Sequence, residues 1–291
     1  MKIACVILNY NDHVNTLKLV QKIQDYENIS YIVVVDNKST DGSYSILKNN
    51  TTNKIHCICT SHNGGYGAGN NYGARYCFQK LGADAILICN PDVSFEKKLV
   101  DQLQDIMQKD EHCGVVSAIQ RDKNNIEINQ SAWRIPSITE YIFSVGKIGS
   151  RLTKKFYISA HELHQKSVTK VGCVAGSLLL VSKEAFEKTG GYDENVFLYC
   201  EETILGCKMK TAGYNTYVCS DVDYLHLHGV TITKNVSSTI KRKKILLKSH
   251  RYTLKTYFEA NALQMLLNDG IGKISILEEY MKEALMKVFQ R

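Results

Sequence analysis

The residues most clearly suited to binding or catalytic chemistry are Asn90-Pro91-Asp92, directly after the apolar run AILIC at 85–89. Proline cannot donate a hydrogen bond to a sheet and disfavours helical geometry in the residue before it, so a strand is predicted to end there. Asp92 then follows the carboxyl end of that strand, where open α/β sheets bind ligands. A carboxylate in this place is suited to hold Mg²⁺ or Mn²⁺ against a diphosphate. The same tripeptide also opens ordinary turns, so both interpretations stay open.

Polar side chains also follow the first two apolar runs of the chain. Asn9 and Asn11 come directly after the run at 3–8, and Asp36 ends the run that begins at Tyr31. Polar groups after a first parallel strand can line a nucleotide crevice, and a carboxylate there can accept a hydrogen bond from a ribose hydroxyl or a base N–H. Asparagine is also a common turn residue and aspartate a common helix cap, so neither assignment is unique.

A glycine-rich segment at 62–71 has the sequence HNGGYGAGNN. Glycines allow the backbone to approach a ligand closely, and a helix expected to begin at Tyr72 would offer its N-terminal N–H groups to an anion. The segment matches neither the dinucleotide-binding fingerprint nor the phosphate-binding P-loop. A plain flexible loop is therefore the alternative.

Acidic and imidazole side chains occur in two later segments. Glu201 and Glu202 follow an aromatic-rich stretch, where partial burial would raise a carboxyl pKa and suit one of them as a general base. They can equally be first-turn acids that complement a helix dipole. His226 and His228 alternate in YLHLHG and would point to opposite sides of an extended segment. One can complete a metal site while the other packs, or both can be structural.

Five short apolar runs predict the elements that position these groups. Runs that do not alternate with polar residues are typical of parallel strands covered on both faces, and here they lie at 3–8, 31–35, 85–89, 114–118 and 177–182. An amphipathic stretch between the first two predicts a helix that Asp12 can cap. With a β-like run at 55–59, this is the opening half of a nucleotide-binding α/β fold. Residues 120–170 predict an inserted or crossing segment, and from about 236 onward the pattern is helical.

The composition predicts a globular protein of the cytosol. The 291 residues are 44% hydrophobic and 22% charged, and several of the ten cysteines lie in or beside apolar runs, which indicates buried reduced thiols. The absence of a C-x-x-C motif makes a structural zinc site unexpected. We expect no signal peptide, and no apolar run approaches the roughly 18–20 residues that span a bilayer.

Positive charge is concentrated towards the C-terminus. Eight basic residues and no acidic residue lie between Lys234 and Lys255, whereas the whole chain has a net charge of +7. A segment of this kind can lie on anionic lipid, bind phosphates or form a solvated face.

The order of the motifs carries more information than any one of them. The chain contains, in sequence, VILNYN (6–11), VVVDN (33–37), HNGGYGAGNN (62–71), ILICNPDV (86–93), VAGSLLLVSKEAFEKTGGYDENVFLYCEE (174–202) and HLHG (226–229). This series resembles the inverting glycosyltransferases of family 2, and within them most closely the rhamnosyltransferases and galactofuranosyltransferases of bacterial polysaccharide assembly. The resemblance covers about residues 3–260.

The resemblance implies a role for each matching residue. The nucleotide-sugar donor would contact residues of the first strands, the glycine-rich segment and the strand end before Asp92, namely Asn9, Asn11, Asp36, Asn63, Gly64, Gly65, Asn70 and Asn90. Asp92 takes the last position of the family's metal-binding Asp-x-Asp motif, whose first Asp is Asn90 here, and His226 matches the metal-associated histidine. Glu202 stands where the family has its Asp general base, and Glu201 is the less favoured candidate.

The implied fold is α/β, the GT-A (nucleotide-diphospho-sugar transferase) fold, with a mostly parallel central sheet flanked by helices. We expect residues 1–235 to form the transferase domain, with a nucleotide-binding half at about 1–118 and an acceptor half at about 119–235. Residues 236–291 would be a basic, amphipathic helical extension.

The implied activity is inverting transfer of a sugar, most specifically rhamnose from dTDP-rhamnose, with Mg²⁺ or Mn²⁺ as cofactor. The acceptor would be a saccharide or lipid-linked saccharide of a capsule, O-antigen or wall polysaccharide. We expect residues 240–258 to lie on an anionic membrane at the cytoplasmic face, no nucleic-acid partner, and an oligomer as a possible state. The alternatives are a non-catalytic nucleotide-sugar-binding scaffold of the same fold and a sugar-phosphate nucleotidyltransferase.

Overall fold

The computed structural model describes residues 1–146, 156–227 and 238–289, without the side chains of 284–289. Its strands are β1 (Ile3–Asn9), β2 (Tyr31–Asp36), β3 (Ile55–Cys59), β4 (Ala85–Cys89), β5 (Val93–Ser94), β6 (Cys113–Arg121), β7 (Ala132–Trp133), β8 (Val168–Val171), β9 (Cys173–Val174), β10 (Leu178–Ser182) and β11 (Asn215–His226). Its helices are α1 (His13–Ile23), α2 (Ser43–Lys48), α3 (Tyr66–Lys80), α4 (Lys97–Lys109), α5 (Ile138–Ser144), α7 (Ala160–Leu163), α8 (Lys183–Thr189), α9 (Glu201–Thr211), α11 (Thr239–Thr256) and α12 (Ala262–Phe289).

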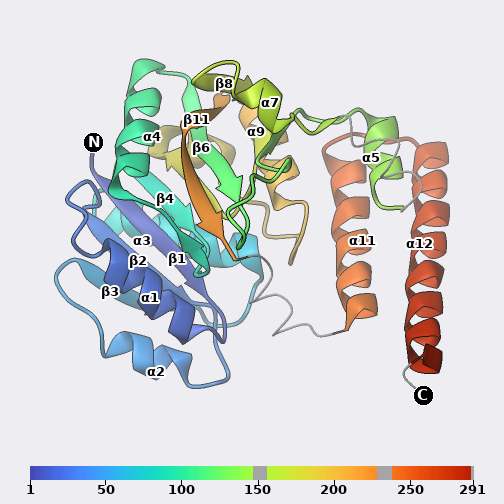
Figure 1. Cartoon of the computed structure of the whole chain (residues 1–291), viewed down its shortest axis with the longest axis horizontal. Helices are drawn as coiled ribbons and strands as arrows, with labels where there is room; N and C mark the ends of the chain where they lie inside the picture. Colours follow the sequence, from blue (N-terminus) through green and yellow to red (C-terminus); the bar gives the residue numbers. More distant parts are fainter. Residues whose placement is uncertain (147–155, 228–237, 290–291) are drawn as a thin grey trace.

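A single large sheet runs through the molecule (Figure 1). The strands follow the order β3-β2-β1-β4-β10-β6-β11-β5, and β8 pairs with β11. The half formed by β3, β2, β1 and β4 is parallel, as are β6 and β11. The carboxyl ends of β1, β2 and β4 therefore meet at one edge of the sheet, and the residues that follow these strands lie at that edge.

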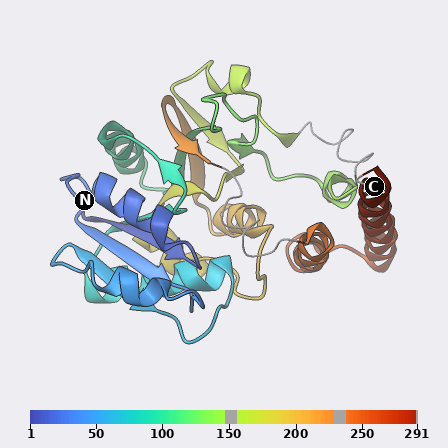
Figure 2. The same ribbon diagram turned by 60° about the horizontal axis from the view of Figure 1, so that its bottom comes forward.

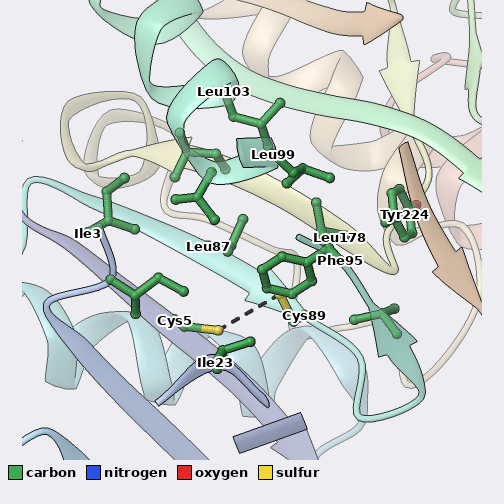
Figure 3. Close-up of a cluster of buried hydrophobic side chains, with 14 of the residues drawn as sticks. Ile3, Cys5, Ile23, Leu87, Cys89, Phe95, Leu99, Leu103, Leu178 and Tyr224 are labelled. Atoms are coloured by element: carbon green, nitrogen blue, oxygen red, sulfur yellow. Dashed lines mark hydrogen bonds between the residues drawn. The ribbon is translucent and has the colours of Figure 1, made fainter. Parts of the chain in front are cut away.

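Helices cover both faces of the sheet, which is why the strands carry unbroken apolar runs. On one face the odd-numbered residues of β1 pack against α1, α2 and α4. Figure 3 shows part of this cluster, in which the Cys5 and Cys89 sulfur atoms lie 3.8 Å apart and Ile23 of α1 and Leu99 of α4 reach the same core. On the opposite face the even-numbered residues of β1 pack against α3, α8 and α9.

The structure confirms the predicted mostly parallel α/β architecture and corrects three local predictions. The run at 177–182 forms β10, which is antiparallel to both of its neighbours, β4 and β6. The helix after the glycines begins at Tyr66 and not at Tyr72, so Gly67 and Gly69 lie inside α3. Asp12 precedes α1 but makes no side-chain cap. Its carboxylate instead accepts hydrogen bonds from the Asn15 side chain.

Three helices form a unit beside the sheet. Figures 1 and 2 both show α11 and α12 standing next to each other, with α12 the more distant from the sheet and α5 packed near them. Tyr141 and Ile142 of α5 share a small buried cluster with Leu254 of α11. The expected helical extension is thus two helices joined by residues 257–261, and it packs with α5 from the predicted acceptor half. The domain boundaries at 119 and 236 remain predictions.

The described cysteines are all free thiols, as their positions in the sequence predicted. Among the described residues, no helix has both the length and the apolar character needed to cross a bilayer.

Candidate active site

At the ends of β1 and β2, the predicted nucleotide residues form a buried polar cluster. The Asn9 Nδ2 donates to Asp36 Oδ2 at 2.8 Å, and Asn9 Oδ1 accepts from the Thr16 hydroxyl at 2.9 Å. Asn9 and Asp36 have no exposed surface. Asp36 also accepts from the Ser39 backbone N–H at 2.9 Å. Asp36 therefore orders the loop after β2, and Asn9 holds its carboxylate in place.

Side-chain hydrogen bonds also fix the loop that follows β1. Asn11 has a positive φ of 55°, and its Oδ1 accepts from the Thr40 backbone N–H at 2.8 Å. Its backbone N–H donates to the Ser39 hydroxyl at 2.9 Å. The loops after β1 and β2 are thereby tied together at the edge of the sheet where these strands end.

The glycine-rich segment is held against this cluster by asparagine side chains. Asn37 Nδ2 donates to the Asn63 side-chain oxygen and to the Gly65 carbonyl, each at 3.0 Å. Asn63 accepts in turn from the Gly65 backbone N–H at 3.0 Å. Asn70, one turn into α3, is fully buried and donates to the Tyr66 carbonyl at 3.1 Å.

Gly65 occupies a position that no other residue fits. Its φ is +93°, and a Cβ atom placed on it would lie 2.1 Å from the Phe197 carbonyl oxygen. That carbonyl accepts from the Tyr66 backbone N–H at 3.0 Å, which ties the start of α3 to the segment leading to Glu201. Gly64 also has little room, because its Cβ would meet the Ala68 Cβ at 2.8 Å. The glycines thus serve close packing between two chain segments.

Asp92 and His226 meet, although 134 positions separate them in the sequence. His226 Nε2 lies 3.2 Å from Asp92 Oδ1, and both side chains are almost completely buried. The other ring nitrogen, Nδ1, is hydrogen-bonded to Gln120 Nε2 at 2.9 Å. Gln120 Oε1 accepts from the Tyr224 hydroxyl at 3.1 Å. Gln120 therefore fixes the orientation of the imidazole and leaves its Nε2 edge facing the carboxylate. His228 lies outside the described residues.

A divalent cation fits this pair in its chemistry. One carboxylate and one imidazole are ordinary ligands for Mn²⁺. The Gln120 Nε2 group can only donate, so His226 Nδ1 accepts this hydrogen bond and Nε2 carries the ring proton that faces Asp92. Ligation through Nε2 would need the Gln120 amide reversed, so that its oxygen accepts from the Nδ1–H group. Among the described residues, no group of three or more acidic, histidine or cysteine side chains can hold a metal. The remaining ligands would have to be donor phosphates and water, as Mg²⁺ and Mn²⁺ prefer.

Glu201 and Glu202 begin α9, directly after an unusual backbone turn. Tyr199 and Cys200 have φ values of 72° and 73°, a left-handed conformation that costs energy for residues other than glycine. The turn directs both carboxyl groups to the N-terminus of α9. Gly176 leaves room for Glu202, since a Cβ there would lie 2.8 Å from Glu202 Oε1.

Burial changes the acidity of both carboxyl groups. Desolvation, and secondarily the nearby Glu202 charge, raises the pKa of Glu201 to about 8. Desolvation also raises the pKa of Glu202, although hydrogen bonds from the backbone of Glu202 itself and of Gly176 oppose the rise. Glu201 Oε1 is buried, and no hydrogen-bond partner for it is found among the described residues. Burial thus favours the protonated form of both carboxyl groups, most clearly that of Glu201.

A cleft of about 810 Å³ brings the catalytic and metal candidates together. Asn90, Glu201, Glu202 and His226 line it, and Asp92 contacts His226 at 3.2 Å without belonging to the lining. Helices α5 and α11 supply the opposite wall, through residues that include Tyr141, Lys243 and His250. The predicted nucleotide residues lie outside this lining, namely Asn9, Asn11, Asp36, Asn63, Gly64, Gly65 and Asn70.

Tyr66 connects the two groups of residues. It follows Gly65 at the start of α3, lines the cleft and donates its hydroxyl to the Gly176 carbonyl at 2.5 Å. Sequence reasoning assigned no role to Tyr66, Gln120 or Gly176. For Gln120 the available signal was its place after the apolar run at 114–118, at the carboxyl end of a strand. Tyr66 and Gly176 lie inside motifs quoted above but were not singled out.

Helices flank a mostly parallel sheet, and a cleft with two carboxyl groups lies beyond its strand ends. This arrangement is that of the GT-A fold, the class of the glycosyltransferases with which the chain is compared below. The mannosyltransferase PcManGT from Pyrobaculum calidifontis, solved with GDP-Man and Mn²⁺, matches 98% of this chain and 75% of its own, with a TM-score of 0.60 and 15% identity. GalNAc-T7, solved with UDP, GalNAc and Mn²⁺, matches 89% of this chain and 50% of its own, with a TM-score of 0.59 and 14% identity. At these identities the likeness establishes the fold.

The sequence comparison identifies the family within this class. Residues 5–190 match the model of "Glycosyl transferase family 2". The chain therefore belongs to glycosyl transferase family 2.

Curated relatives are similar at modest identity. The low-salt glycan biosynthesis hexosyltransferase Agl10 of Haloferax volcanii is 27% identical over 81% of this chain and 70% of its own length. The N-acetylglucosaminyl-diphospho-decaprenol L-rhamnosyltransferase of Mycobacterium tuberculosis is 27% identical over 67% of this chain and 66% of its own. The dTDP-rhamnosyl transferase RfbF of Shigella flexneri is 25% identical over 95% of this chain and 84% of its own.

Proposed function

We propose that this chain is an inverting glycosyltransferase that moves rhamnose from dTDP-rhamnose to a saccharide or lipid-linked saccharide during synthesis of a bacterial cell-surface polysaccharide. The observation that carries the proposal is the shared cleft, in which a pair of buried carboxyl groups faces the same space as His226 and Asn90. The choice of rhamnose rests on the names of relatives such as RfbF and the mycobacterial L-rhamnosyltransferase. The latter name also motivates a lipid-linked acceptor.

Glu202 acts as the general base in this proposal. Its carboxylate takes the proton of the acceptor hydroxyl while the oxygen attacks the anomeric carbon. The new bond joins that oxygen to the anomeric carbon, and the bond from this carbon to the nucleoside diphosphate breaks, which inverts the configuration. Glu202 is favoured over Glu201 because it stands where the family has its Asp general base. Desolvation raises the pKa of Glu202, which makes its carboxylate a stronger base than an exposed one.

Asp92 and His226 would hold the Mg²⁺ or Mn²⁺, with the donor diphosphate supplying further oxygen ligands. A bound cation would neutralise charge that develops on the departing diphosphate. Asn90 stands where a second carboxylate is usual, so we expect the site to hold the metal chiefly together with the donor. Asp36 and the loop it orders would position the base or ribose, and Asn63, Gly64, Gly65 and Asn70 would shape the donor side.

The acceptor would enter between the sheet and the helical unit. Trp133 and Tyr157 line the cleft near the carboxyl pair, while Tyr141 and His250 stack at 4.0 Å between ring centroids on the helical side. Aromatic walls with a few polar groups are typical of sites that bury an organic ligand. We also expect the basic residues within 240–258 to lie towards an anionic membrane at the cytoplasmic face.

A donor panel tests the proposal. The purified chain is incubated with dTDP-, UDP- and GDP-sugars with Mn²⁺, with Mg²⁺ or with a chelator, and release of nucleoside diphosphate and binding are both measured. We expect dTDP-rhamnose to bind and to be hydrolysed slowly, and the hydrolysis to stop with chelator. Asp92→Ala should weaken metal-dependent donor binding, whereas Asp221→Ala, an exposed acid outside the cleft, should not. Binding of donors without any metal-dependent hydrolysis or transfer would favour a non-catalytic scaffold.

A further inference from the structure

Helix α12 leaves most of its described large apolar side chains exposed, although Met265 and Ile271 pack against the cluster around Leu254. Its buried positions include Asn268, Gly272 and Ser275, which are small or polar. Among the α12 side chains that the structure describes, five large apolar ones are more than half exposed, with exposed fractions of 59–74%: Leu263, Leu266, Ile274, Leu277 and Met281. A surface helix of a globular protein normally turns its apolar face to the core. An apolar stripe of this length marks a surface that is covered by something other than water.

The exposed face of α11 is of a different kind. Its exposed positions follow helical spacing and are basic along almost the whole helix: Lys241, Lys244, Lys248, Arg251 and Lys255. The opposite face of α11 contributes to the cleft, through Lys243, Leu246 and His250. One helix therefore separates the cleft from a row of positive charge.

Contacts between α11 and α12 place the two stripes side by side. The helices are antiparallel, because Thr239 bonds Glu283 at 2.6 Å near one end and Arg251 pairs with Asp269 at 3.0 Å near the other. Arg251 belongs to the basic stripe. Asp269 has Leu266 as a neighbour three residues earlier on its own helix, so the apolar stripe begins just beyond this ion pair. The basic and apolar stripes thus lie on the same side of the helix pair, linked by the Arg251–Asp269 ion pair.

We propose that this surface docks on an anionic lipid bilayer, with the α12 stripe in the acyl boundary and the α11 stripe against lipid phosphates. Two observations favour lipid over a second copy of the chain. A symmetric pairing through α12 would bring two basic stripes close together, which is unfavourable. Small residues such as Gly272 and Ser275 at the helix contact, with large apolar residues facing outward, are also the arrangement of helices packed within lipid. The described helices cannot cross a bilayer, so the helix pair would lie along its surface.

The arrangement gives the cleft a defined place relative to the membrane. Because opposite faces of α11 line the cleft and carry the basic stripe, about one helix diameter, roughly 10 Å, separates them. A lipid-linked saccharide could therefore enter the cleft while its lipid stays in the bilayer. The membrane position of the basic stripe and this consequence rest on the proposed function, whereas the exposed apolar stripe of α12 is observed independently of it.

Vesicle flotation tests the surface directly. The purified chain is mixed with zwitterionic phosphatidylcholine vesicles or with vesicles that also contain phosphatidylglycerol, at low and high salt. We expect strong binding to the anionic vesicles, weakened by salt. Leu266→Gln with Leu277→Gln should weaken this binding at least ten-fold. Lys244→Gln, Lys248→Gln and Lys255→Gln together should weaken it about a hundred-fold, and only on anionic vesicles.

Controls distinguish membrane binding through this surface from effects of net charge, of folding and of catalysis. A triple variant of exposed lysines elsewhere, Lys18→Gln, Lys80→Gln and Lys109→Gln, has the same net charge and should float almost as the parent does. All variants should keep the parent Tm and metal-dependent donor hydrolysis, since the altered side chains are exposed. Absence of flotation, or flotation that the stripe variants do not reduce, overturns the surface whatever the hydrolysis result. A dimer in light scattering that Leu266→Gln with Leu277→Gln dissociates, without flotation, would assign the stripe to a second copy instead.

Discussion

At the scale of single residues, Glu201 and Glu202 are adjacent in the chain but occupy different environments. Glu201 is almost fully buried, with one oxygen that has no partner among the described residues, whereas Glu202 lies against the Gly176 backbone. Adjacent residues at the start of a helix point in directions about 100° apart, so one can reach the reacting atoms while the other holds a proton.

The assignment of the base predicts unequal effects of two isosteric substitutions. Glu202→Gln should lower transfer about 10²–10⁴-fold and leave the donor Kd unchanged, because general-base catalysis contributes in this range. Glu201→Gln should retain much more activity. Since the pKa of Glu202 is raised from 4.5, the acidic limb of kcat/KM should lie above pH 4.5 in the parent and in Glu201→Gln. Normal transfer by Glu202→Gln, with inactive Glu201→Gln, would exchange the two roles.

The raised pKa of Glu201 also predicts how stability depends on pH. The folded chain keeps the Glu201 proton up to about pH 8, but the unfolded chain releases it near pH 4.5. Unfolding therefore releases a proton between these values, and stability falls as the pH rises through this window. Glu201→Gln cannot ionise, so it should raise Tm by several degrees at pH 9 and by little at pH 5, as measured by calorimetry. The exposed Glu111→Gln should show no such difference between the two pH values.

At the scale of elements, the segment between β3 and α3 depends on one glycine. Gly65 lies where the loop touches Phe197, and the hydrogen bonds of Asn37 and Asn63 converge on it. This contact connects the donor side of the site to the turn that presents the carboxyl pair. Its geometry therefore influences both halves of the proposed reaction.

Replacing Gly65 and a control glycine separates the free-energy cost of a steric clash from the cost of backbone strain. Gly65→Ala should cost at least about 3 kcal/mol of unfolding free energy, because a positive φ and a backbone clash at 2.1 Å act together. Gly82→Ala is a matched control, since Gly82 has a φ of +63° and open space around it, and should cost only about 1–2 kcal/mol. Urea denaturation measures both. Equal losses in the two variants would show that contact with Phe197 contributes nothing.

Strand prediction succeeded where it relied on local pattern. The run AILIC at 85–89 forms β4 with the predicted bounds, and its five residues are all buried. The run at 177–182 was identified as a strand, but its direction was wrong. A strand buried on both faces has the same composition whichever way it runs, so direction depends on which connection precedes it.

At the scale of the whole molecule, the helical unit and the sheet share one site. Leu254 is fully buried with Tyr141 and Ile142 in a cluster separate from the two cores that flank the sheet. The same helices supply the wall of the cleft opposite the carboxyl pair. Loosening this cluster should therefore affect the acceptor side of the site more than the donor side.

Two leucine-to-alanine substitutions, one in the helical unit and one in the core beside the sheet, test whether the helical unit affects the acceptor side alone. Leu254→Ala should cost about 2–5 kcal/mol in the helical unit, increase hydrogen exchange in α11 and raise the acceptor KM, with an unchanged donor Kd. Leu103→Ala, equally buried in the core beside the sheet, should destabilise the chain comparably without the specific change in acceptor KM. The proposal that the helices bind the acceptor fails if both variants alter acceptor and donor parameters alike.

Sequence by itself determined the class of fold, the positions of the main strands, and the order of motifs that places this chain in its family, since these follow from local hydrophobic pattern and residue identity. Only the tertiary structure decided which polar residues meet. Gln120 contacts His226 across 106 positions, and α5 and α11 close a cleft that begins at the ends of β4 and β6. Such contacts depend on how distant elements pack, and a pattern read along the chain contains no distance between them. The site roles proposed for Asp92, His226 and Glu202 thus combine residue types visible in the sequence with proximity that arises only on folding.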